Sequence, residues 1–223
     1  MGAATVARLI DHTLLKPEAT PDRVRELCRE AREHGFAAVC VNPAWVRICA
    51  HELDATTTAV ATVAGFPLGA SVPEVKAAEA ARAVEDGARE VDMVLNVGAL
   101  KAADHRFVER DVAGVVDACG RAGALVKVIL EAALLTDEEK ARGCAIAKLA
   151  GAAFVKTSTG FGPGGATAAD VSLMRRVVGP GVGVKAAGGI RDWAAARAMV
   201  AAGASRIGTS AGPQVLAGAR AAG

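Results

Sequence analysis

One unit, a short apolar segment followed by a longer alanine-rich segment of helical character, repeats along the whole chain. Several of the alanine-rich segments end in the same Gly-Ala pair, at Gly87, Gly123, Gly151 and Gly203. Short and continuously apolar strands are typical of a parallel sheet that helices cover on both faces. The repeat therefore predicts an α/β protein in which parallel strands alternate with helices.

Eight of the apolar segments can be interpreted as strands. They cover residues 9–14, 37–43, 57–67, 90–97, 125–131, the stretch from 153 that contains Lys156, 183–188 and 206–210. Eight strands and their helices in 223 residues predict a TIM (β/α)8 barrel that forms a single domain over residues 1–223. A doubly wound open sheet is the alternative. No GxGxxG motif follows the first strand, and polar residues gather at the ends of many strands, which favours the barrel.

Local signals predict helices at both ends of the chain. Thr20 is a suitable N-cap and Pro21 a suitable first residue for a helix over 22–34, which Gly35 ends. The Ala/Gly-rich residues 214–223 predict a short closing helix.

Charge and composition exclude several classes of function. The net charge of +2 arises from 26 basic and 24 acidic residues that are interspersed, and aromatic residues make up only 3%. Both observations disfavour a nucleic-acid or membrane-surface partner. No apolar run approaches the roughly 20 residues that cross a bilayer, and no signal-like segment opens the chain, so we expect a cytoplasmic protein.

The five cysteines and four histidines show no ligand spacing. The cysteines are odd in number and include no CxxC pair, which indicates reduced thiols. The histidines are isolated from one another and from the cysteines. We therefore predict no metal site and no cofactor.

Lys156 interrupts a strand of apolar residues that ends in Thr-Ser-Thr and a glycine-rich loop, 160–165. Burying an ammonium costs several kcal/mol unless a partner or a chemical use compensates. A buried lysine that loses its proton is a nucleophile for carbonyl groups. The alternative is a lysine that extends from a strand end into water.

Other strands also carry polar residues, and in a barrel all eight C-terminal strand ends converge on one mouth. These residues are Asp11, Cys40, Asn42, Asp92, Lys127, Glu131 and Lys185. For Lys127 and Glu131 a role only in buried ion pairs stays open.

Lys156 and Lys185 lie on adjacent predicted strands. A second ammonium about 6 Å away contributes roughly 3 kcal/mol of repulsion, or about two pKa units, and partial burial supplies the remainder. The pattern predicts one nucleophilic lysine activated by another that stays charged. Asp92 is suited to anchor the charged lysine and to pass protons through water.

Loops after the last three predicted strands are suited to bind one small anion. Backbone N–H groups, hydroxyls and a guanidinium come from Thr159, Gly160, Gly188, Gly189, Arg191, Gly208 and Ser210. Barrels commonly hold phosphate at the loops after strands 7 and 8, whereas the alternative is ordinary tight turns.

With these residues in view, the chain resembles the deoxyribose-phosphate aldolases, a family of class I aldolases, over nearly its whole length. The matching stretches are IDHTLLKP (10–17), VCVNP (39–43), GFPLGA (65–70), EVDMV (90–94), LVKVI (125–129), FVKTSTGFG (154–162), VKAAGGIR (184–191) and SRIGTS (205–210).

The resemblance implies reversible cleavage of 2-deoxy-D-ribose 5-phosphate to glyceraldehyde 3-phosphate and acetaldehyde, in deoxynucleoside catabolism. Lys156 then matches the Schiff-base lysine, Lys185 the lysine that perturbs it and Asp92 the proton-transfer residue. Asp11 and Cys40 match positions near the substrate, and the anion-binding residues named above match the phosphate site. A homodimer is also implied. The alternatives are another Schiff-base aldolase or transaldolase-like enzyme, and a non-catalytic phosphate-binding barrel.

The sequence departs from the family pattern twice. Ala211 follows Ser210 where many members have a second serine, and no tyrosine is present to supply the C-terminal tyrosine that reaches the site in some members.

Overall fold

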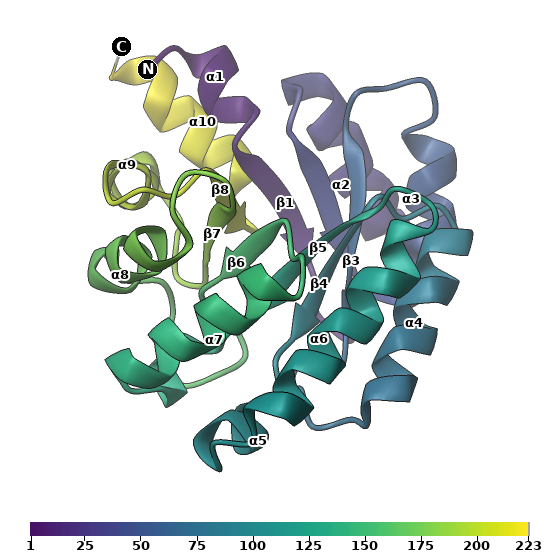
Figure 1. Cartoon of the computed structure of the whole chain (residues 1–223). Helices are drawn as coiled ribbons and strands as arrows, with labels where there is room; N and C mark the ends of the chain where they lie inside the picture. Colours follow the sequence, from purple (N-terminus) through teal and green to yellow (C-terminus); the bar gives the residue numbers. More distant parts are fainter. Residues whose placement is uncertain (223) are drawn as a thin grey trace.

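A computed structural model describes residues 1–222 as a closed barrel of eight parallel strands, in which each strand pairs with the next and β8 pairs with β1 (Figure 1). The strands are β1 (Ile10–Leu14), β2 (Ala38–Val41), β3 (Ala59–Ala64), β4 (Glu90–Val94), β5 (Leu125–Ile129), β6 (Phe154–Lys156), β7 (Gly183–Ala187) and β8 (Arg206–Thr209). The predicted TIM barrel is confirmed, and the doubly wound sheet is excluded because the sheet closes on itself.

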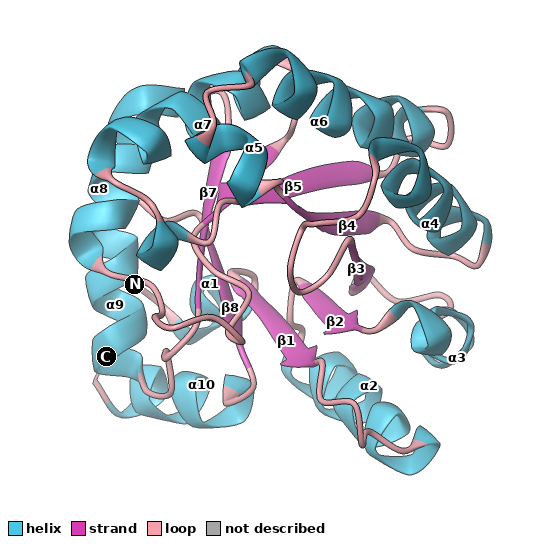
Figure 2. Cartoon of the chain, turned by 90° about the horizontal axis from the view of Figure 1, so that it is seen from below, coloured by secondary structure: helices cyan, strands magenta, loops and turns pink. Residues whose placement is uncertain are grey.

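Helices form an outer ring around the strands (Figure 2). They are α1 (Ala3–Ala7), α2 (Pro21–His34), α3 (Val46–Glu52), α4 (Pro73–Glu85), α5 (Val97–Lys101), α6 (His105–Gly120), α7 (Asp137–Leu149), α8 (Ala168–Val178), α9 (Trp193–Ala201) and α10 (Gly212–Ala221), with short 3-10 turns η1 (Pro43–Trp45) and η2 (Ala132–Leu134). Within residues 1–222, none of these helices is both long and apolar enough to cross a membrane.

The predicted start of α2 is confirmed. The hydroxyl of Thr20 accepts a hydrogen bond from the backbone N–H of Arg23, and Pro21 is the first helical residue. Gly35 ends the helix in the left-handed conformation, with φ of 66°. The closing helix α10 begins at Gly212, two residues before the predicted start, and residue 223 lies outside the described residues.

Most strands end earlier than their apolar runs predict, and the prediction for 90–97 is wrong at its C-terminal end. β4 stops at Val94, because the side chain of Asn96 accepts a hydrogen bond from the N–H of Ala99 at 2.9 Å and caps α5. Leu95 is fully buried although it lies outside the strand. An apolar run therefore reports burial here rather than the length of the strand.

The barrel interior is asymmetric. On one side β2 and β3 contribute a small apolar cluster, in which Ala38, Cys40, Ala61 and Val63 pack against Leu15. The other strands contribute charged side chains that are buried. Those side chains are Asp11, Glu90, Asp92, Lys127, Lys156 and Lys185. The apolar core proper lies between the strands and the ring of helices.

Candidate active site

A cavity of about 270 Å³ opens at the C-terminal ends of β1, β6, β7 and β8. It is lined by Thr13, Leu14, Leu15, Lys16, Lys156, Thr159, Gly160, Phe161, Ala187, Gly188, Gly189, Ile190, Arg191, Gly208, Thr209 and Ser210. The structure thus brings Lys156 together with every residue predicted to bind the anion. We call Thr159, Gly160, Gly188, Gly189, Arg191, Gly208 and Ser210 the anion cup.

Lys156 is the last residue of β6 and forms part of the cavity wall. Its side chain is almost completely buried, with 2% of the residue exposed. Its Nζ lies 2.8 Å from Oδ2 of Asp92. Of the three buried lysines on neighbouring strands, Lys127, Lys156 and Lys185, only Lys156 lines the cavity.

Asp92 links the three lysines. Its Oδ2 accepts hydrogen bonds from Lys156 at 2.8 Å and from Lys185 at 2.7 Å, and its Oδ1 accepts one from Lys127 at 2.7 Å. The strand register explains this arrangement, because Asp92 is paired with Lys127 across β4 and β5, and Lys156 with Lys185 across β6 and β7. Neighbouring residues at one level of a parallel sheet point to the same face.

Further ion pairs extend this contact around the barrel. Lys185 donates to Asp11 at 2.5 Å, Arg206 donates to the other oxygen of Asp11 at 2.6 Å, and Lys127 lies 2.6 Å from Glu90. Arg206 also donates to Glu90 at 3.2 Å. We call Asp11, Glu90, Asp92, Lys127, Lys156, Lys185 and Arg206 the buried ion network.

The charges of this network balance only if Lys156 is neutral. Three carboxylates face three cations, Lys127, Lys185 and Arg206, before Lys156 is added. Burial lowers the pKa of Lys156, and repulsion from Lys185 lowers it further against the opposing attraction of Asp92. Burial also disfavours the charged form of Lys185, but the carboxylates of Asp11 and Asp92 outweigh it and raise the pKa of Lys185.

Burial contributes more to the lowered pKa of Lys156 than repulsion does. The sequence predicts the larger share from the neighbouring ammonium, and in the structure burial is the larger cause. The reason is that Lys156 is nearly inaccessible to water and that Asp92 accepts from both lysines, which screens one charge from the other.

Asp11 and Cys40 lie beneath the cavity and are not among the residues that line it. Both are fully buried, and the two oxygens of Asp11 are occupied by Lys185 and Arg206. Burial raises the pKa of the Cys40 thiol. Their contact with substrate stays a prediction, whereas the place of Asp11 in the network is a structural fact.

The two residues left open by the sequence have different surroundings. Lys127 forms buried ion pairs with Glu90 and Asp92. Glu131 forms no ion pair within residues 1–222; instead its carboxylate accepts a hydrogen bond from the hydroxyl of Thr159. Glu131 adopts a left-handed backbone conformation, with φ of 55°. Its hydrogen bond holds Thr159, one residue of the anion cup.

Glycine is required at the centre of the anion cup. Gly188 has φ of 90°, and a side chain there would place its Cβ 2.9 Å from the Cα of Gly165. The hydroxyl of Thr209 donates to the carbonyl of Ile190 at 2.6 Å and joins the loops after β7 and β8. Arg191 is exposed and forms no ion pair within the described residues, so its guanidinium is available to an anion.

Lys16 and Phe161 also line the cavity, although the sequence argument assigned them no role. Lys16 follows the first strand, so the rule that barrel sites lie at C-terminal strand ends would have included it. The residues around Lys16 in the sequence give no further signal, since an exposed lysine in a loop is common.

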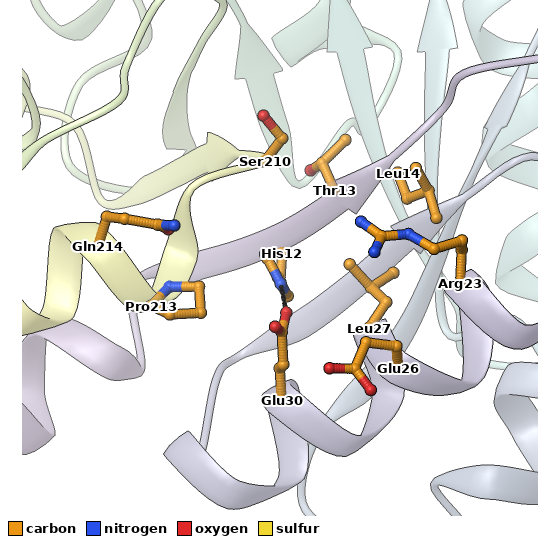
Figure 3. Close-up of a pocket in the computed structure, with 10 residues that line it drawn as sticks. All are labelled: His12, Thr13, Leu14, Arg23, Glu26, Leu27, Glu30, Ser210, Pro213 and Gln214. Atoms are coloured by element: carbon orange, nitrogen blue, oxygen red, sulfur yellow. Dashed lines mark hydrogen bonds and ion pairs between the residues drawn. The ribbon is translucent and has the colours of Figure 1, made fainter.

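A second cavity of about 240 Å³ lies between β1, α2 and α10 (Figure 3). His12 and Glu30 meet there, with His12 Nε2 2.6 Å from Glu30 Oε2. The cavity shares Thr13, Leu14 and Ser210 with the first but is lined by no lysine, so it offers no amine to a carbonyl group. Within residues 1–222 no three His, Cys, Asp or Glu side chains are grouped to hold a metal ion.

Comparisons with known proteins agree in one family. The model of the DeoC/LacD family aldolases matches residues 5–218. A deoxyribose-phosphate aldolase of Listeria innocua is 58% identical over 214 residues, which are 96% of each chain, and that of Halalkalibacterium halodurans is 57% identical over 220 residues, 98% of each. The solved deoxyribose phosphate aldolase of Aeropyrum pernix, described as tetrameric, superposes with a TM-score of 0.91 at 38% identity and covers 97% of this chain and 91% of that one.

Proposed function

Because this chain belongs to the DeoC/LacD family of aldolases, we propose that it cleaves 2-deoxy-D-ribose 5-phosphate reversibly into D-glyceraldehyde 3-phosphate and acetaldehyde, with Lys156 as the Schiff-base lysine. One observation carries the assignment of Lys156. It is the only one of the three buried lysines, Lys127, Lys156 and Lys185, that lines the cavity, and the residues of the anion cup line the same cavity.

In the first step the neutral amine of Lys156 adds to the C1 aldehyde of the open-chain sugar. Loss of water from the carbinolamine leaves a protonated imine, which accepts electrons from the C2–C3 bond. Removal of the proton from the C3 hydroxyl breaks that bond and releases glyceraldehyde 3-phosphate. The remaining enamine takes a proton at C2, and hydrolysis of the imine frees acetaldehyde and Lys156.

Asp92 is the group suited to move these protons, and Lys185 is the charged group beside it. Oδ2 of Asp92 contacts the Nζ atoms of both Lys156 and Lys185, so a proton can pass to or from the reacting atoms by way of one carboxylate and one water. Lys185 stays protonated in this scheme because two carboxylates surround it. Its charge in turn favours the neutral form of Lys156.

The phosphate end of the substrate is held in the anion cup. Arg191 supplies a guanidinium, the glycines supply backbone N–H groups, and Ser210 supplies a hydroxyl. Because these groups line the same cavity as Lys156, binding of the phosphate orients the sugar before the amine attacks.

Two further properties of the chain stay proposals. All five cysteines are free thiols, which supports a reducing compartment and hence the predicted cytoplasmic location. A homodimer stays a prediction as well, and the tetramer described for the Aeropyrum pernix relative makes a dimer one of several assemblies to be distinguished by mass in solution.

The decisive experiment traps the covalent intermediate. The protein is treated with acetaldehyde and borohydride, digested, and analysed for the mass of an added ethyl group. We expect the adduct on Lys156, and its loss together with more than about 10³-fold of the cleavage rate in Lys156→Met. Lys148→Met, which changes an exposed lysine on α7, is the matched control and should retain the adduct.

An adduct that persists in Lys156→Met would reject the assignment of the nucleophile. Absence of any adduct in the unchanged protein, with phosphate still bound, would favour the non-catalytic phosphate-binding barrel. Another Schiff-base aldolase would form an adduct with a ketose substrate but not with acetaldehyde.

A further inference from the structure

Lys16 and Phe161 meet above the cavity, although they come from loops on different sides of its mouth. Lys16 follows β1 and Phe161 follows β6. The Nζ of Lys16 lies 5.7 Å from the centroid of the Phe161 ring, within the range of a cation–π contact. Both residues line the cavity together with Arg191 and Ser210 of the anion cup.

The backbone beneath Lys16 is fixed. Leu15 is buried and packs in the apolar cluster inside the barrel. The carbonyl of Leu15 accepts a hydrogen bond from the side chain of Asn42 at 3.1 Å, and the carbonyl of Lys16 accepts one from the N–H of Ala19 at 3.1 Å. The side chain of Lys16 is exposed and extends from this fixed stretch of backbone.

Phe161 is held from the other side. Gly160 turns the chain with φ of 85°, and the N–H of Phe161 donates to the hydroxyl of Thr159 at 3.0 Å. The ring packs edge to face against Phe66, with a centroid distance of 5.3 Å. Phe66 packs in turn against the cluster that contains Leu15. The aromatic ring is therefore a fixed surface for the ammonium of Lys16 when the cavity holds no substrate.

A phosphate monoester needs more positive charge than Arg191 supplies. Such a group carries about −1.5 to −2 charges at neutral pH. Arg191 is the one cation among the residues of the anion cup, and Lys16 is the remaining cation that lines the cavity apart from Lys156. Lys16 forms no ion pair with any carboxylate within residues 1–222, so its charge is not already compensated.

We propose that Lys16 is the second phosphate-binding cation of this site, held over the cavity by Phe161 until the phosphate arrives. The proposal rests on the proposed function, and it deepens it by assigning a residue that decides between phosphorylated and unphosphorylated sugars. The ammonium leaves a weak contact with the ring and forms a charge-assisted hydrogen bond to a phosphate oxygen, which is stronger.

The test compares Lys16→Gln, Lys16→Arg and the control Lys148→Gln, which removes the same charge from the exposed surface of α7. The measured quantity is the ratio of kcat/KM for deoxyribose 5-phosphate to kcat/KM for deoxyribose. We expect Lys16→Gln to lower this ratio about tenfold, through KM of the phosphorylated sugar, and Lys16→Arg to restore most of it. Phe161→Leu, which removes the ring but keeps an apolar side chain, should lower the ratio about twofold to threefold.

Calorimetric titration with inorganic phosphate gives a readout that needs no turnover. Lys16→Gln should weaken phosphate binding about tenfold relative to Lys148→Gln. The unchanged protein could bind phosphate more tightly than Lys16→Gln and yet cleave no deoxyribose 5-phosphate. The proposed reaction would then fail while the assignment of Lys16 stands. If both lysine variants change the ratio and the phosphate affinity equally, or if Lys16→Gln changes both sugars equally, Lys16 is not a phosphate ligand.

Discussion

The floor and the rim of the cavity are built in opposite ways. At the floor of the cavity Lys156 joins the buried ion network, in which almost every oxygen and nitrogen already has a partner within 3.3 Å. The rim is the anion cup, where Arg191 and Ser210 are exposed and four of the seven residues are glycines. The charges in the floor are already paired with one another, whereas Arg191 in the rim has no ion pair within the described residues.

This difference determines how mutations act. In the floor, removing one charge leaves its partners buried without compensation and changes the pKa values of the others. In the rim, water replaces a missing side chain, so the loss is limited to the contact itself. We therefore expect large and coupled effects below Lys156, and smaller effects above it that depend on the phosphate of the substrate.

Asp92→Asn should give the largest effect. A smaller effect than that of a rim variant would contradict the difference between floor and rim. The amide removes the one carboxylate that contacts three lysines. We expect the free energy of unfolding to fall by about 3 to 5 kcal/mol and the cleavage rate to fall about 10³-fold. Urea unfolding and steady-state kinetics measure the two losses. A loss of rate with stability unchanged would mean that the network does not contribute to the fold.

Lys185→Leu tests the coupling of charges in the floor through the pH dependence of the cleavage rate. Lys156 and Lys185 share Oδ2 of Asp92, so their Nζ atoms lie within about 5.5 Å, where repulsion amounts to roughly 3 kcal/mol. Without Lys185, three carboxylates face Lys127, Arg206 and Lys156, and the charges balance when Lys156 is protonated. The pKa of Lys156 should therefore rise by about two units, and its neutral fraction at pH 7 should fall about a hundredfold.

Only the neutral form of an amine is nucleophilic, and its fraction rises with pH, so activity of Lys185→Leu should be low at pH 7 and recover in part as the pH rises to about 9 or 10. The borohydride adduct should remain on Lys156. A rate loss that is the same at every pH would instead assign Lys185 a direct role in proton transfer, and an adduct absent only from this variant would reverse the roles of the two lysines.

Arg191→Ala tests the rim and should give a smaller, substrate-dependent effect. Arg191 lines the cavity and has no ion pair within the described residues, so its removal leaves no buried charge unpaired. We expect KM for deoxyribose 5-phosphate to rise about tenfold to a hundredfold, with little change for deoxyribose. Ser210→Ala should act in the same direction by about threefold, because a neutral hydroxyl donates a weaker hydrogen bond. Equal changes for both sugars would place the anion elsewhere.

The sequence was sufficient for the barrel, for the common mouth and for the group of residues around Lys156, because period, strand ends and glycine loops are local signals. It was insufficient for Arg206 and Glu90. Both are the first residues of their strands and lie far from the mouth. Glu90 reaches Lys127 of the adjacent strand β5, and Arg206 reaches Asp11 only because β8 closes against β1. Closure of this kind leaves no local pattern.

The depth of a side chain was likewise not predictable. The sequence did not show that Asp11 and Cys40 are fully buried and absent from the cavity lining, and their contact with substrate stays a prediction. Lys16 was passed over because nothing in its loop distinguishes it from other exposed lysines, and its contact with Phe161 spans 145 positions of the chain. Residue type and position along a strand predict how close a side chain lies to the mouth of the barrel. Whether that side chain lines the cavity depends on how its neighbours pack.

The hydrogen bond between Arg206 and Asp11 joins residues 195 positions apart in the chain. A ribosome that adds about 5 to 20 residues per second completes Asp11 roughly 10 to 40 s before it adds Arg206. For most of that interval the carboxylate has neither partner, because Lys185 follows Asp11 by 174 residues and Arg206 by 195. Asp11 therefore obtains both of its cationic partners only from the last two strands of the barrel to be synthesised, β7 and β8.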